Sequence, residues 1–83
     1  MSVYESVRLD IQQFLATNYE IELDALAPDA TLEGSGFDSL GLLGIATLLE
    51  NKYGLKFDTQ SMFRVHTFKD LIAVVKAKCT ELA

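Results

Sequence analysis

The sequence predicts an all-α protein, a four-helix bundle with three main helices, one short helix and a long first loop. Apolar residues recur at helical spacing in three separate segments, and residues that commonly cap helices precede them. With one Pro and five Gly, the chain has few of the turn residues that a β-sandwich needs. Its 83 residues are expected to form a single domain, residues 1–83, whose core is too small to surround a deep catalytic cleft.

The first helix is expected from about Val3 to Asn18. Its apolar residues recur at intervals of three and four, and polar residues fall between them. The apolar positions are Val3, Val7, Ile11, Phe14 and Leu15. Ser2 and Glu5 have the spacing of a capping box, so the helix is expected to begin directly after Ser2.

The segment from residue 19 to residue 38 has no steady period and is expected to be a long connection. Gly34 and Gly36 disfavour a continuous helix there. Loops of this length in small domains are usually functional or held by their own apolar side chains. We expect the apolar residues of this segment to pack into the core; they are Ile21, Leu23, Leu26 and Leu32.

The second helix is expected from Ser39 to Tyr53, because Gly54 suits the position that ends a helix. Its core face consists of Leu42, Ile45, Ala46, Leu49 and Tyr53. Its other face consists of Leu40, Leu43, Gly44, Thr47 and Asn51. The two leucines of that second face are therefore expected to be partly exposed. Gly41 and Gly44 each cost up to about 1 kcal/mol relative to Ala inside a helix, which suggests a close approach by another backbone or a ligand.

A short helical turn is expected to start at Asp58 or Thr59 and to end at Arg64. The last helix is expected to end near residue 82, and Thr67 and Asp70 form the T-x-x-D pattern of a capped helix at its start. Its apolar face consists of Phe68, Leu71, Ile72, Val75 and Cys79. The aromatic residues expected in the core are Phe14, Phe37, Phe57, Phe63 and Phe68.

Composition excludes several classes of function. A net charge of −5 and a pI of about 4.6 disfavour binding to nucleic acid or to an anionic membrane surface. One Cys and one His exclude an internal disulfide and a Cys/His metal site. No G-x-S-x-G, Walker or calcium-loop pattern occurs, so we do not expect an enzyme. No signal peptide is evident and the longest uncharged stretch, residues 39–49, is too short to span a membrane, so we expect a cytoplasmic protein.

The junction between the long connection and the second helix is the strongest candidate site. Asp38 suits an N-cap, and Ser39 follows it in the first turn. Free N–H groups and the positive end of the helix dipole favour an anion there, such as a phosphate esterified to Ser39. On the local sequence alone, a simple N-cap pair explains these two residues equally well.

The sequence Gly36-Phe37-Asp38-Ser39-Leu40 resembles the G-x-D-S-L attachment motif of acyl carrier proteins. The apolar helix after the motif, the helix end at residues 50–54, the short helix near Met62 and the capped last helix are also similar to that family, so the resemblance covers essentially the whole chain. It implies a free-standing, monomeric carrier that performs no chemistry itself.

The resemblance implies that a phosphopantetheinyl transferase moves 4′-phosphopantetheine from coenzyme A to Ser39, which Asp38 and Leu40 flank. The thiol of this arm would then hold an acyl group as a thioester for acyl-loading and acyl-accepting enzymes. Such partners dock largely on the helix that begins at the serine. The implied docking residues are Leu40, Leu43, Gly44, Thr47 and Glu50. An alternative position for Phe63, outside the core, is the wall of a groove for the carried group.

Two departures from the family bear on the pathway. Positions 41 and 44 are often acidic in fatty-acid carriers, whereas both are Gly here. This less charged face favours a dedicated pathway, for a polyketide or another secondary metabolite, over housekeeping fatty-acid synthesis. Gly after D-S-L is also similar to D-alanyl and other aminoacyl carriers, so an aminoacyl carrier is one alternative. An interaction subunit of the same fold that bears no arm is another.

Overall fold

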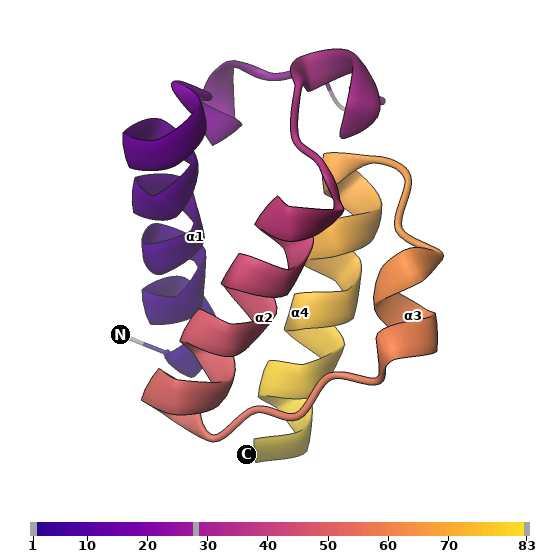
Figure 1. Cartoon of the computed structure of the whole chain (residues 1–83). Coiled ribbons are helices and arrows are strands. Elements are labelled where there is room, and N and C mark those ends of the chain that lie inside the picture. Colours follow the sequence, from indigo (N-terminus) through magenta and orange to yellow (C-terminus); the bar gives the residue numbers. More distant parts are fainter. Residues whose placement is uncertain (1, 28, 83) are drawn as a thin grey trace.

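The computed structural model describes residues 2–27 and 29–82, which fold into four helices around one core (Figure 1). The helices are α1 (Val3–Tyr19), α2 (Ser39–Tyr53), α3 (Thr59–Phe63) and α4 (Phe68–Leu82). The long helices α1, α2 and α4 lie side by side, α3 packs against α4, and the α1–α2 connection crosses one end of the bundle. The predicted all-α class is therefore confirmed.

Capping residues lie where the sequence predicts them. Ser2 Oγ accepts a hydrogen bond from the Glu5 amide at 3.2 Å, and Thr67 Oγ1 accepts one from the Asp70 amide at 3.0 Å. Gly54 ends α2 with φ 73°, in the left-handed region that glycine adopts without strain. The predicted bounds of α2 and α4 are confirmed, while α1 is one residue longer and α3 one residue shorter than predicted.

The core contains side chains from α1, α2 and α4 and from the long connection. Side chains with no exposed area include Val7, Ile11, Leu15, Ile45, Leu49, Leu71 and Val75. The apolar residues of the connection pack into this core as predicted, with Leu26 only partly buried. Cys79 is also buried, in the packing role that its place on the apolar face predicts.

Phe63, which was expected in the core, lies outside it, and so does Val3, one of the predicted apolar positions of α1. Phe63 is 65% exposed, because α3 has one inward side and Met62 occupies it. Val3 is 44% exposed, because it lies in the first turn of α1 and no earlier turn covers it. Phe37 and Phe68 are buried as expected, whereas the two other phenylalanines are only partly buried; these are Phe14 and Phe57.

Backbone hydrogen bonds attach the long connection to the start of α4. The Leu32 amide donates to the His66 carbonyl at 2.9 Å, and the Phe68 amide donates to the Ala30 carbonyl at 3.2 Å. Two short 3-10 turns also order the connection; they are η1 (Leu23–Ala25) and η2 (Glu33–Ser35). These hydrogen bonds therefore hold the path of the connection in place before the chain enters α2.

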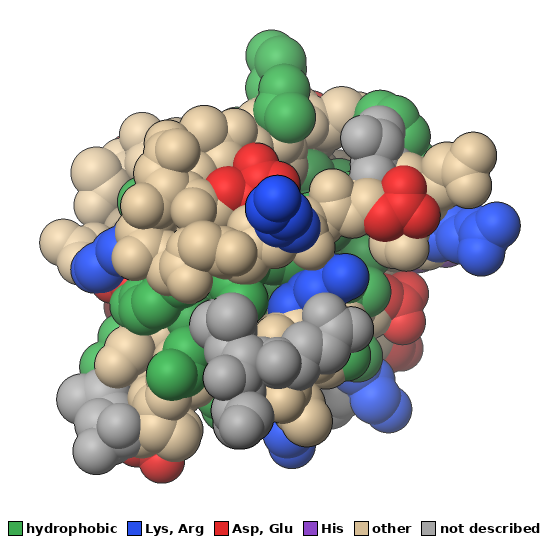
Figure 2. Space-filling model, turned by 90° about the horizontal axis from the view of Figure 1, so that it is seen from below, with side chains coloured by type: hydrophobic (Ala, Val, Ile, Leu, Met, Phe, Trp, Pro, Cys, Tyr) green, Lys and Arg blue, Asp and Glu red, His purple; other side chains and the backbone are tan. Residues whose placement is uncertain are grey.

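Charged side chains are spread over the surface. Seen from below, hydrophobic, basic and acidic side chains are interspersed on this face of the molecule (Figure 2). Arg8 and Asp24 form an ion pair of 2.5 Å that joins α1 to η1. Because both side chains are substantially exposed, this pair contributes little to stability.

Candidate functional site

The first turn of α2 presents Ser39 at the surface. Asp38 caps the helix with an extended backbone, and its Oδ1 accepts a hydrogen bond from the Gly41 amide at 3.0 Å. Ser39 is the first helical residue and is exposed. Its amide and that of Leu40 have no acceptor within the helix, because no preceding turn supplies one. The structure therefore places a hydroxyl at the positive end of a 15-residue helix, where an esterified phosphate is favoured.

Tyr19, the last residue of α1, reaches the cap of α2. Its hydroxyl donates a hydrogen bond to Asp38 Oδ1 at 3.4 Å. Partial burial of the phenol, and secondly the charge of Asp38, raise the pKa of Tyr19 above its usual value, so the hydroxyl keeps its proton at neutral pH. The sequence analysis missed Tyr19, because a contact between residues 19 positions apart leaves no local pattern.

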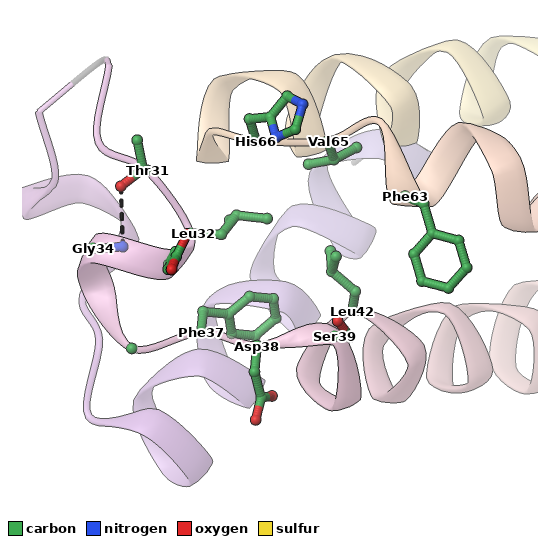
Figure 3. Close-up of a pocket in the computed structure, with 12 residues that line it drawn as sticks. Thr31, Leu32, Gly34, Phe37, Asp38, Ser39, Leu42, Phe63, Val65 and His66 are labelled. Carbon is green, nitrogen blue, oxygen red and sulfur yellow. Dashed lines mark hydrogen bonds between the residues drawn. The ribbon is translucent and has the colours of Figure 1, made fainter.

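Ser39 borders an open hollow of about 860 Å³ (Figure 3). Residues 31–34 and 36–39 form one wall, and Phe63, Val65 and His66 form the opposite wall. The Asp38 side chain points away from these three residues, while the side chains of Leu32 and Leu42 point into the space between the two walls. Ser39 is exposed at the rim of this hollow.

A second, smaller hollow of about 250 Å³ lies between α2 and α3. Its lining is mainly apolar, with Ser39 and Glu50 as its polar members; the apolar members are Leu40, Leu42, Leu43, Ala46, Phe57, Met62 and Phe63. Ser39, Leu42 and Phe63 border both hollows. Phe63 is thus a groove residue, the alternative position considered for it above.

The residues expected to form the docking surface differ in accessibility. Leu40 is 73% exposed and Leu43 is 63% exposed, and Thr47 is exposed beside them. Glu50 is exposed, and its carboxylate accepts a hydrogen bond from the Phe57 amide at 3.3 Å. These four residues lie on one open face of α2.

Gly44, which was expected among the docking residues, is only partly exposed, and Gly41 is buried. A Cβ at Gly44 would lie 2.9 Å from Phe14 Cζ, and one at Gly41 would lie 2.6 Å from Phe37 Cε1. Gly44 therefore makes room for a ring of α1, at the border of the open face rather than within it. The side chains that approach the two glycines closely in the structure are the aromatic rings of Phe14, Phe37 and Tyr19.

The described residues give little support to a metal site, a membrane-spanning helix or a reactive thiol. In the part of the chain that the structure describes, no three His, Cys, Asp or Glu side chains gather to hold a metal ion. None of the described helices combines the length and apolarity needed to cross a membrane. Burial raises the pKa of the Cys79 thiol, which disfavours the reactive thiolate.

Residues 10–75 match the protein family described as the phosphopantetheine attachment site. The chain belongs to this family. The family's domain is the attachment point of the 4′-phosphopantetheine prosthetic group, and the matched segment includes the whole of α2. An exposed hydroxyl at a helix start, beside a hollow, is a fitting site for such a phosphate ester.

Known acyl carrier proteins resemble the chain in sequence and fold. An acyl carrier protein homolog of Mycoplasma genitalium is 30% identical over 59 residues, which cover 71% of this chain and 70% of the relative. The acyl carrier protein of Thermotoga maritima has the same fold, with a TM-score of 0.75, 19% identity, and coverage of 96% and 94% of the two chains. The acetyl actinorhodin acyl carrier protein of Streptomyces coelicolor has a TM-score of 0.71, 25% identity, and coverage of 98% and 94%.

The predicted resemblance to acyl carrier proteins is confirmed by these comparisons. The prosthetic group of this family is 4′-phosphopantetheine, which is the predicted cofactor. Proteins of this family carry acyl groups rather than catalyse reactions, and they interact with enzymes of acyl metabolism.

Proposed function

We propose that this acyl carrier protein bears its arm on Ser39 and presents an acyl group, held as a thioester, to partner enzymes. One observation carries this proposal, namely the exposed hydroxyl of Ser39 at the first residue of α2. Asp38 holds the helix start beside it, and Leu40 is exposed on its other side. When bound, the arm supplies a thiol whose thioester activates the acyl carbonyl and raises its local concentration at a docked enzyme.

A phosphopantetheinyl transferase installs the arm from coenzyme A. Ser39 Oγ forms a bond to the phosphorus atom that bears the pantetheine, and the bond that links this phosphorus to the second phosphate of coenzyme A breaks. The serine proton passes to a base of the transferase, and the adenosine bisphosphate leaves. Ser39 can enter such a reaction because its side chain is exposed on the rim of an open hollow.

The docking surface consists of Leu40, Leu43, Thr47 and Glu50, and Gly44 sets its border with α1. The apolar hollow between α2 and α3 adjoins this surface and opens at Ser39. It can therefore shelter an apolar part of the carried group between visits to partner enzymes.

We assign the carrier to a dedicated pathway, for a polyketide or another secondary metabolite. Two observations support this: the exposed apolar side chains of Leu40 and Leu43 on α2, and the similarity to a carrier named for actinorhodin. An aminoacyl carrier is less favoured, because Gly41 is needed for the packing of Phe37 and Tyr19 and so carries no information about the cargo.

Intact-mass measurement tests the attachment site. The chain is incubated with coenzyme A and a broad-specificity phosphopantetheinyl transferase, and we expect a gain of one phosphopantetheine. Ser39→Ala should abolish the gain, whereas Ser35→Ala, which changes another serine of the same junction, should keep it. No gain in the wild type would show that the chain bears no arm, and a gain in Ser39→Ala would place the arm elsewhere.

The cargo can be classified on protein isolated from its native source. The group that hydroxylamine releases from the thiol should be a carboxylic acid derivative without an α-amino group. A released α-amino acid would establish the aminoacyl alternative. A carrier that is never found with an arm in its source, and that co-purifies with a partner regardless of Ser39→Ala, would establish the armless alternative.

A further inference from the structure

We propose that Tyr19 is a positioning residue for the modification of Ser39 and acts through the Asp38 carboxylate. This inference rests on the proposed attachment of the arm to Ser39. It extends the site beyond the attachment sequence, residues 36–40, to the end of α1.

Two donors converge on one oxygen of Asp38. The Gly41 amide donates to Oδ1 at 3.0 Å, and the Tyr19 hydroxyl donates to the same atom at 3.4 Å. A carboxylate oxygen can accept two hydrogen bonds, and two donors from different helices restrict its rotation. Asp38 is exposed, so without Tyr19 only the capping hydrogen bond would hold its side chain.

The Tyr19 ring is held in place by other aromatic rings. It meets Phe37 edge to face, with 4.9 Å between ring centroids, and it lies 6.1 Å from the Phe14 ring. Phe37 is 2% exposed and contacts Phe68 at 5.7 Å between centroids. Because the phenol is already ordered by packing, its hydrogen bond costs little additional conformational entropy.

Two backbone features keep the hydroxyl beside the cap. A Cβ at Gly41 would lie 2.8 Å from the Tyr19 hydroxyl oxygen, so glycine leaves the space that this hydroxyl occupies. Glu20 ends α1 with φ 55°, which is uncommon for a residue other than glycine, and its amide donates to the Leu15 carbonyl. The chain thus leaves α1 directly after Tyr19.

Asp38 directly precedes the nucleophile, so its orientation is linked to that of the first turn of α2. If the carboxylate rotates freely, the capping hydrogen bond loosens and Ser39 Oγ samples more directions. A nucleophile must be aligned with the bond that breaks, and loss of alignment slows the chemical step more than it weakens docking. Removal of the Tyr19 hydroxyl should therefore lower kcat rather than raise KM.

The experiment compares Tyr19→Phe with Tyr53→Phe in the transfer from coenzyme A. Both changes delete a hydroxyl that donates to an aspartate, but Tyr53 bonds Asp10 at 2.5 Å at the other end of α2. With Tyr19→Phe we expect kcat to fall about three- to tenfold, the size expected for loss of one hydrogen bond, and KM for the carrier to stay within about twofold. With Tyr53→Phe we expect a lower melting temperature and an unchanged kcat.

A double variant and hydrogen exchange complete the test. In an Asp38→Ala background, Tyr19→Phe should cause no further fall in kcat, and in the single variant the Gly41 amide should exchange faster. An unchanged kcat in Tyr19→Phe, a rise in KM alone, or a fully additive effect in the double variant would each overturn the role of Tyr19. A wild type that takes up no phosphopantetheine would instead overturn the proposed function.

Discussion

At the scale of single residues, aromatic packing explains why two positions of α2 are occupied by glycine. A Cβ at Gly41 or Gly44 would collide with a ring of Phe37 or Phe14. Gly41 is buried against Phe37, so it leaves no room for the acidic side chain that fatty-acid carriers often have there, whereas Gly44 can accept a larger side chain if the half-buried Phe14 ring shifts.

The two glycines should respond differently to alanine. Gly41→Ala should lower the free energy of unfolding by about 1–2 kcal/mol, because Phe37 is buried and cannot move aside, and the gain in helix propensity only partly offsets the overpacking. Gly44→Ala should change it by less than about 0.5 kcal/mol, because the half-buried Phe14 can shift and the propensity gain offsets the cost. Urea unfolding of both variants checks this, and a Gly41→Ala protein as stable as Gly44→Ala would contradict it.

Single-residue predictions from the sequence succeed where the cause is local. The capping of α2 by Asp38 and the exposure of Ser39 depend on residues within one helical turn, so the sequence contains the signal. The contact between Tyr19 and Asp38 depends on how the long connection folds back, and no short pattern encodes that path. The mid-helix glycines were the one available sign of a close approach, and they did not reveal which side chain made it.

At the scale of elements, a carboxylate of α1 holds the C-terminal end of α2. Asp10 accepts hydrogen bonds from the Tyr53 hydroxyl at 2.5 Å and from Lys52 Nζ at 3.1 Å. The hydrogen bond from Tyr53, helped by Lys52, lowers the pKa of Asp10 below its usual value. The same hydrogen bond raises the pKa of Tyr53 to about 12. Both shifts favour the pair of an ionised Asp10 and a protonated Tyr53.

This junction should make stability depend on pH in a defined direction. A carboxyl group whose pKa is lowered by folding stabilises the protein above its unfolded pKa of about 3.9 and loses that effect as pH falls through the folded pKa. Asp10→Asn should therefore lower the free energy of unfolding by about 1 kcal/mol at pH 7, and the difference from wild type should disappear as pH falls through the lowered pKa of the folded state. Thermal melts at several pH values check this; a constant difference across the range would contradict it.

Prediction of elements from the sequence was accurate for long helices and weaker for short ones. A 15-residue helix repeats its apolar pattern over four turns, so its inward face is well defined. The five residues of α3 make little more than one turn, too short for a clear pattern, and the expectation that Phe63 is a core residue was wrong because Met62 is the buried one. The 3-10 turns of the connection depend on non-local bonds such as that between Leu32 and His66, which sequence patterns do not report.

At the scale of the whole molecule, most of the charge lies outside the proposed docking surface, in which Glu50 is the one charged residue. Residues 1–50 contain nine acidic residues and one basic residue, for a net charge of −8, yet no charged residue occurs from Leu40 to Leu49. Leu40, Leu43 and Phe63 are each more than 60% exposed around Ser39. Contact with a partner at this surface therefore buries apolar area, while the acidic residues contribute mainly through long-range attraction.

A pair of leucine variants measures the contribution of that surface. Leu43→Ala should raise KM for the carrier in phosphopantetheine transfer about five- to thirtyfold, because a leucine side chain that becomes buried contributes roughly 1–2 kcal/mol. Leu9→Ala is the matched control: Leu9 is 53% exposed on α1 and borders neither hollow beside Ser39, so KM should not change. The Leu43 effect should be the same in 50 mM and 500 mM salt, since screening acts on charges and not on apolar contact. Equal effects of the two variants, or a Leu43 effect that salt removes, would show that the partner does not recognise the apolar face of α2.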